Sequence, residues 1–165
     1  MEDIEDEELI NNTGEQYFIF LSDQNLYALP VLNVIEIVEY QAITKVPKLS
    51  SFVKGVTNIR GNIVAVIDML DRFKLGETQV QDRTSFAIVQ VVVNDKHYDI
   101  AIMIDQIYEV DGLDKDSVCD TPIFGTKIQA EFITALGTYN KQEVTIINHQ
   151  EVLKISELSQ IKDLL

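Results

Sequence analysis

The sequence contains few of the cysteine, proline and glycine residues on which many secreted proteins and enzymes rely. Its 165 residues include three prolines, seven glycines, no tryptophan and one cysteine, Cys119. A single cysteine permits no internal disulfide, which fits a protein of the reducing cytoplasm. The low proline and glycine content excludes collagen-like and low-complexity architectures, and the length suits one domain or two small lobes.

Basic residues are also scarce. There are 13 Lys+Arg against 27 Asp+Glu, a net charge of −14. Seven of the acids and no base lie in residues 1–16, so residues 1–15 are predicted to form a disordered, self-repelling acidic tail. The remaining chain has no cluster of Lys and Arg. Nucleic acids and anionic membrane surfaces are therefore unfavourable partners.

Long hydrophobic runs are missing as well. The longest uninterrupted apolar runs, such as Ile63–Ile67 and Ile100–Ile104, have five residues, whereas a membrane-spanning helix needs about 20. The first residues are acidic, where a secretion signal needs a basic start and an apolar core. We expect a cytoplasmic protein that does not insert into a membrane.

Most of the chain instead shows short apolar segments separated by turn residues, the pattern of an all-β protein with a few short helices. Its two halves share a layout. Each opens with a hairpin (residues 17–29 and 85–104), continues with an apolar-x-Glu-apolar segment, and ends with a second hairpin. Each second hairpin runs into a residue that can cap a short helix, Asp68 or Asn148. This repetition predicts two pseudo-repeated β barrels with a groove between them. A final helix is expected over residues 155–165.

Signatures of catalysis are weak. There is no Walker A sequence, no GxGxxG and no spaced cysteine or histidine pair that would hold a metal, so no cofactor is expected. Cys119 has only His97 or His149 as a possible base. Asp68 follows an apolar strand, as the phosphate-accepting aspartate of a receiver domain does. The preceding Gly61-Asn62 turn makes that strand antiparallel, which favours the helix cap.

Two charged residues stand out. Arg60 is predicted at a hairpin tip, and Glu36 interrupts an otherwise apolar strand. An arginine fork and a carboxylate at such places can pair. The alternative is that each is an ordinary solvated surface charge.

The residues from Phe52 to Asp68 resemble the signature of CheW-like domains. That signature is roughly aromatic-[VI]-x-G-[VI]-x-N-[LI]-R-G, followed by an apolar strand that ends in Asp. The resemblance extends over residues 16–154, nearly everything but the acidic tail and the C-terminal helix. Ala65, Ala101 and Asn148 depart from it, where proline, glycine and aspartate are usual.

This resemblance implies two interlocked SH3-like barrels of five strands each, with no enzymatic activity. It implies an adaptor, a monomer in isolation, that couples the cytoplasmic tips of chemoreceptors to the regulatory domain of the histidine kinase CheA. Through the receptors it would be recruited to the inner face of the membrane. A CheW-like adaptor of another chemosensory system, for twitching motility or development, is the alternative, and phosphotransfer through Asp68 a remote one.

Site residues follow from the resemblance by position. The receptor-binding groove would include Val34, Glu36, Arg60 and Ile107, with the two apolar residues lining it. The kinase-binding residues would be Val31 in the first lobe and Phe124 in the second. For the apolar residues, ordinary core packing is the competing interpretation.

Overall fold

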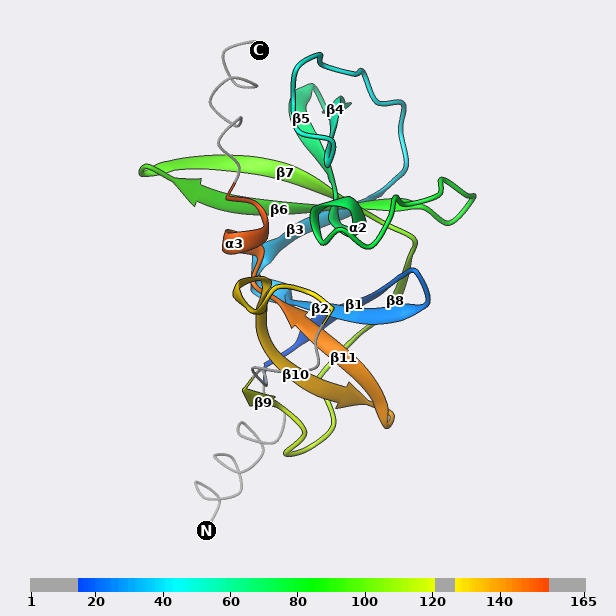
Figure 1. Ribbon diagram of the computed structural model, residues 1–165, viewed down its shortest axis with the longest axis vertical. Coiled ribbons are helices and arrows are strands. Elements are labelled where there is room, and N and C mark those ends of the chain that lie inside the picture. Colours follow the sequence, from blue (N-terminus) through cyan, green and yellow to red (C-terminus); the bar gives the residue numbers. More distant parts are fainter. Residues whose placement is uncertain (1–14, 121–126, 155–165) are drawn as a thin grey trace.

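The computed structural model describes residues 15–120 and 127–154 (Figure 1). The predicted acidic tail, apart from Glu15, and the predicted C-terminal helix lie outside the described residues, as does Phe124. The described chain is mostly β, as the sequence predicts. Its elements are β1 (Tyr17–Ser22), β2 (Asn25–Pro30), η1 (Val31–Asn33), β3 (Val34–Glu39), β4 (Val53–Ile59), β5 (Asn62–Asp68), α2 (Met69–Arg72), β6 (Ser85–Val93), β7 (Lys96–Ile104), β8 (Gln106–Asp111), β9 (Cys119–Asp120), η2 (Ala130–Phe132), β10 (Ile133–Tyr139), β11 (Gln142–Ile147) and α3 (His149–Val152).

The strands form two sheets, one in each lobe. The five-strand lobe has the order β3-β6-β7-β5-β4, and the six-strand lobe has the order β8-β1-β2-β11-β10-β9. The sixth strand, which the sequence does not predict, is the two-residue β9 at one edge. In Figure 1 the five-strand lobe lies above the six-strand lobe.

The two sheets repeat one plan, but the halves of the chain exchange their first hairpins. The β1–β2 hairpin lies beside β8 and β11 of the second half, and the β6–β7 hairpin lies beside β3 and β5 of the first half. In both sheets the hairpin pairs antiparallel with the apolar-x-Glu strand and parallel with the return strand of the second hairpin. The two lobes are therefore interlocked rather than one per half.

Alternate residues of the exchanged hairpins serve two different cores. On β1, Tyr17 and Ile19 face the interior of the six-strand lobe, whereas Phe18 and Phe20 belong to a core shared by both lobes. On β6, Phe86 and Ile88 line the interior of the five-strand lobe, while Ala87 and Val89 join the shared core. Burial of both faces explains why these strands are apolar without alternation.

The segment before β4 contributes no strand to the five-strand lobe. Residues 43–46 form only an isolated bridge, between Thr44 and Val56, instead of a strand. Pro47 interrupts the ladder because it lacks an amide donor. Gly55, at φ 141°, is required beside this bridge, since a Cβ there would collide with the Thr44 carbonyl oxygen.

The arginine of α2 joins the lobes. The guanidinium of Arg72 lies between the rings of Phe52 and Phe132, 4.6 and 4.8 Å from their centroids. Its Nε donates to the Val152 carbonyl oxygen at 2.9 Å. Phe52 precedes β4 of the five-strand lobe, whereas Phe132 and Val152 belong to segments that flank the last hairpin of the six-strand lobe.

Replacing this arginine should loosen the contact between the lobes. We expect Arg72→Ala to lower the free energy of unfolding by about 2 kcal/mol, because it removes two cation–π contacts and a charge-assisted hydrogen bond. Urea unfolding measures the change. Lys96→Ala, at the exposed start of β7, is the control and should change it by less than about 0.5 kcal/mol. Equal losses in the two variants would contradict the role given to Arg72.

Burial lowers the pKa of His149 on α3 from its usual 6.5. Below about pH 6.5 the unfolded chain therefore binds a proton that the folded chain does not, so the free energy of unfolding falls as the pH drops. We expect His149→Gln to reduce the loss of stability between pH 7 and pH 5, measured by urea unfolding at each pH. His97→Gln, at an exposed position, should leave that loss unchanged.

Candidate protein-interaction site

Asp68 is placed as a helix cap and is inaccessible to a phosphate donor. Its carboxylate is fully buried. One oxygen accepts from the Leu70 amide at 3.1 Å and the Thr78 hydroxyl at 2.7 Å, and the other accepts from the Thr78 amide at 2.8 Å. These bonds occupy the carboxylate, which counts against the phosphotransfer alternative. Among the described residues no group of His, Cys, Asp and Glu side chains is arranged to hold a metal.

Glu36 and Arg60 form an ion pair, as one of the two sequence interpretations predicts. The guanidinium nitrogen lies 3.0 Å from the carboxylate oxygen. The arginine side chain is 78% exposed and the glutamate side chain 23%. The arginine therefore exposes its positive charge to solvent, while the glutamate that pairs with it is partly buried. The pair joins β3 to the tip of the β4–β5 hairpin.

The hairpin tip lies one residue earlier than predicted. Positive φ angles occur at Arg60 (52°) and Gly61 (86°), not at Gly61 and Asn62, and Ile59 pairs with Asn62. Two consecutive positive φ angles fit the tight turn that matches strand twist. The Asn58 side chain accepts from the Gly61 amide at 2.8 Å and braces the turn. A left-handed conformation is less favourable for arginine than for glycine, and Lys141 adopts it at the equivalent tip of the other lobe.

A β-bulge directs Glu36 toward the arginine. On β3, Val34 pairs with Val89 but Glu36 pairs with Ile88, so the register shifts between them. The extra residue, Ile35, places Val34 and Glu36 on opposite faces, whereas simple alternation would place them on the same face. Glu36 thus lies on the face of the five-strand lobe's own core, the core that contains residues of β4 and β5.

The other two predicted groove residues occupy equivalent positions in the two lobes. Val34 lies on β3 and is partly buried against the shared core. Ile107 lies on β8, opposite Phe20 of that core, and is 46% exposed. The β8 strand has the same bulge, at Tyr108. Both residues therefore lie on the sheet faces that meet between the lobes, although on different edge strands.

Sequence reasoning missed two neighbours of these residues. Ile37 of β3 and Val110 of β8 pair with Ala87 and Phe18 of the shared core. Val110 is 52% exposed. A bulge puts residues three apart on one face, and the sequence offered no signal for it beyond the shared apolar-x-Glu-apolar motif. The six-strand lobe has Asn140 and Lys141 at its equivalent hairpin tip, so the Glu–Arg pair distinguishes the lobes.

The predicted kinase-binding residues are less completely described. Val31 opens η1, where its amide donates to the Gln16 carbonyl oxygen at 3.0 Å, and its side chain packs partly against the shared core. The next residue, Leu32, is 93% exposed. The turn thus holds Val31 against the protein and projects Leu32 into solvent, a feature that sequence reasoning missed.

Comparison with known proteins fits this two-lobed architecture. A family model described as a CheW-like domain matches residues 16–157, and so spans both lobes. The chain therefore belongs to the CheW-like domain family. It resembles the solved scaffolding protein TtCheW of Thermoanaerobacter tengcongensis with a TM-score of 0.76 and 25% identity, covering 86% of this chain and 89% of the other.

Relatives in other bacteria support the same family membership. The chemotaxis protein CheW of Klebsiella aerogenes is 27% identical over 88% of this chain and 86% of its own length. Protein FrzA of Myxococcus xanthus is 26% identical over 85% and 86%. The family and these relatives place the chain among the scaffold proteins of chemotaxis. Within the described residues, no helix is both long and apolar enough to span a bilayer.

The ion pair should matter little for stability. We expect Arg60→Gly to leave the free energy of unfolding unchanged or raise it by up to about 1 kcal/mol, because glycine accepts a positive φ and an exposed pair contributes only about 0–1 kcal/mol. Arg60→Ala, which keeps the unfavourable conformation, should be the less stable of the two. Chemical denaturation ranks them. A loss well above 1 kcal/mol in the glycine variant would show that the pair supports the fold instead.

Proposed function

We propose that this chain is a non-enzymatic adaptor of a chemosensory array, which couples the cytoplasmic tips of chemoreceptors to the regulatory domain of the histidine kinase CheA. The observation that carries the proposal is a family match over both lobes, joined to an ion pair that one lobe alone presents. The adaptor works in the cytoplasm and reaches the membrane through its receptors. It needs no chemistry, since it acts by holding its partners and binding their states unequally.

The receptor is proposed to dock where β3 and β8 border the space between the lobes. Val34 and Ile107, with Val110, offer an apolar surface on the faces that flank the shared core. An amphipathic helical hairpin can bury its own apolar face there. The Glu36–Arg60 pair lies on the other face of the same edge strand, β3, and its exposed guanidinium can pair with an acidic or carbonyl group of the receptor.

The kinase is proposed to bind at two other places, one on each lobe. Val31 supports the first-lobe contact, and Leu32 beside it provides the apolar side chain that a partner would bury. Phe124 is the proposed contact of the second lobe. A chain with two separate kinase contacts and one receptor surface can link several partners into a continuous array.

A second setting for the same adaptor is a chemosensory system other than flagellar chemotaxis. The relative FrzA, which is not named as a chemotaxis protein, favours considering it. The adaptor role is the same in both settings. The two settings differ in the kinase that binds the adaptor. A titration of the chain against the kinase regulatory domains of the organism distinguishes them.

Receptor binding should depend on the charge at the hairpin tip. We expect Arg60→Glu to weaken binding to a receptor signalling fragment at least about tenfold, because two acids then face each other across the former pair and the exposed cation is lost. Calorimetric titration measures this, and binding to the kinase regulatory domain should be unchanged. Lys141→Glu, the same charge change at the equivalent tip of the other lobe, is the matched control.

The converse variants test the kinase contacts. Phe124→Ala, Val31→Ala and Leu32→Ala should weaken one-to-one binding to the kinase regulatory domain while receptor binding persists. Circular dichroism confirms that each variant is folded. Wild-type receptor binding by folded Arg60→Glu would overturn the groove assignment, and absence of any kinase binding by the wild-type chain would overturn the adaptor role in that pathway.

A further inference from the structure

The five-strand lobe has an open groove that the proposed adaptor role does not use. Its volume is about 490 Å³, and it lies between the segment before β4 and the connector that follows α2. Its apolar lining includes Ile43, Val46, Leu49 and Val80, the last of which is 51% exposed. The lining also includes polar side chains, among them Glu77 and Thr78, and a groove of this size can receive two or three side chains of an extended or helical segment.

The groove is bordered by lysines in an acidic protein. Residues 40–54 contain three lysines and no acid, although the chain carries a net charge of −14. Lys54 is already paired, with Asp71 at 3.0 Å and Glu77 at 3.3 Å. Lys45, which lines the groove, and the nearby Lys48 are exposed, and neither takes part in an ion pair with the described residues.

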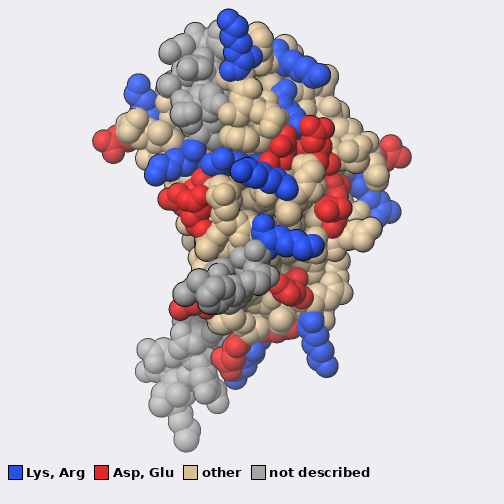
Figure 2. All heavy atoms as spheres, viewed as in Figure 1, with Lys and Arg blue, Asp and Glu red and all other residues tan. Residues whose placement is uncertain are grey.

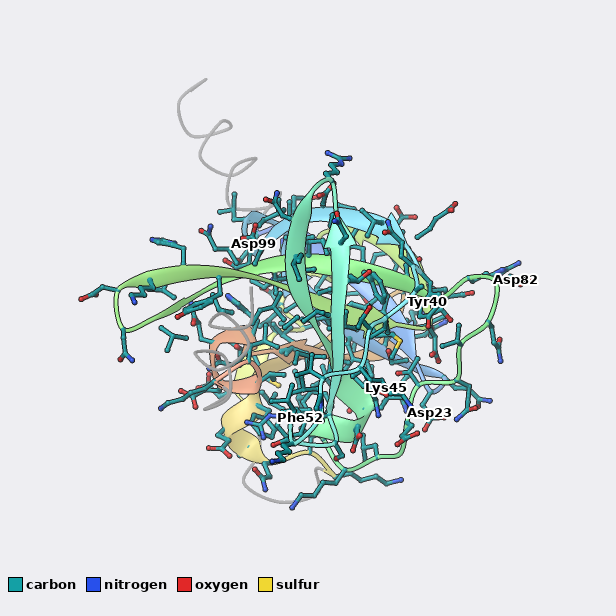
Figure 3. All side chains as sticks on the ribbon, turned by 90° about the horizontal axis from the view of Figure 1, so that it is seen from above. Asp23, Tyr40, Lys45, Phe52, Asp82 and Asp99 are labelled. Carbon is teal, nitrogen blue, oxygen red and sulfur yellow. The ribbon has the colours of Figure 1, made fainter. Side chains whose placement is uncertain are left out.

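Figures 2 and 3 show where charged side chains lie on the protein. Figure 2 shows most of the Lys and Arg side chains of the face in view over the five-strand lobe, with Asp and Glu side chains among them. In Figure 3, Tyr40 and Lys45 lie on the same side of the β4–β5 hairpin as Asp23 and Asp82, whereas Asp99 lies on the other side. Within residues 40–54 the lysines have no acid as a neighbour along the chain, although acids of other segments lie on the same side of the molecule.

The segment that carries these lysines is held in place. Thr44 exchanges two backbone hydrogen bonds with Val56, at 2.8 and 2.9 Å, and the Thr57 hydroxyl donates to the Ala42 carbonyl oxygen at 3.0 Å. Leu49 packs against the shared core and Ile43 against the core of the five-strand lobe. A ligand therefore meets a preformed surface and does not have to order this segment on binding.

The chain itself contains a segment of complementary chemistry. Residues 2–10 combine six acids with three apolar residues, Ile4, Leu9 and Ile10. The rest of the chain is net acidic and repels this segment, except where lysines lie apart from acids. Fourteen residues can extend to about 45 Å. A domain of this size has a radius of gyration of only about 14 Å, so the segment can reach either lobe.

We propose that the acidic N-terminal segment, residues 2–10, docks on the groove of its own chain, with its carboxylates at Lys45 and Lys48 and its apolar side chains in the lining. Because the segment is tethered, its effective concentration is about millimolar, so a weak contact is substantially occupied. The docked segment covers the groove against other acidic ligands. This inference does not rest on the adaptor function.

A spin label on the segment tests the docking in the full chain. The labelled variant is Asn11→Cys with Cys119→Ser, which keeps every acid and removes the exposed native cysteine. We expect line broadening at the amides of residues 43–46, Lys48 and Val80 at low salt. It should weaken at least about twofold when the Debye length is cut from about 30 Å at 0.01 M salt to about 3 Å at 1 M.

Charge reversal at the groove supplies the control. Lys45→Glu with Lys48→Glu should remove the broadening, whereas Lys96→Glu with Lys141→Glu, which changes the net charge equally at distant turns, should keep it. Broadening that is absent, or that both double variants reduce alike, would overturn the proposal. A mixing experiment gives a further test, in which a spin-labelled chain without isotope label is added to an isotope-labelled chain without spin label. Full broadening in this mixture would also overturn the proposal, because the occupant of the groove would then be a second copy of the chain.

Discussion

Burial of both faces of the β1–β2 and β6–β7 hairpins is the constraint on which the rest of the structure depends. Phe18, Phe20, Ala87 and Val89 meet in the core shared by the lobes, while the residues between them fill separate interiors. A change of register by one residue in either hairpin would exchange these two sets. The relative position of the lobes is therefore fixed by the same side chains that fix each sheet, and the Arg72 contact adds to this at the periphery.

The candidate site follows from the repetition of one plan and from one difference between the lobes. The edge strands β3 and β8 have the same bulge and present apolar residues on equivalent faces. In the five-strand lobe the bulge also directs Glu36 to the tip of the β4–β5 hairpin. There it pairs with Arg60, which has a positive φ angle. The repeated plan supplies an apolar surface between the lobes, and the Glu36–Arg60 pair adds an exposed positive charge on the other face of β3, in one lobe only.

The sequence predicted the strands well because strand, turn and cap are local. The hairpins and the Asp68 and Asn148 caps follow from residue type and spacing, whereas the pairing of Glu36 with Arg60 was one of two interpretations that residue type left open. The exchange of hairpins does not, because it depends on which distant strand completes each sheet. The bulges at Ile35 and Tyr108, and the turn at Arg60 rather than Asn62, also escaped prediction, since a register shift of one residue leaves the apolar pattern almost unchanged.

The exchanged hairpins also constrain how the chain can be made and divided. Leu26 of β2 pairs with Val144 of β11, so an early strand gains this neighbour only after nearly the whole described chain has been synthesised. Such distant pairing slows folding because the loop must close before contacts stabilise it. A break in the connector between α2 and β6 would give two fragments, each lacking the hairpin that completes its sheet. Neither fragment is a domain by itself. The two should regain the fold only by associating, because each fragment contains the hairpin that completes the other's sheet.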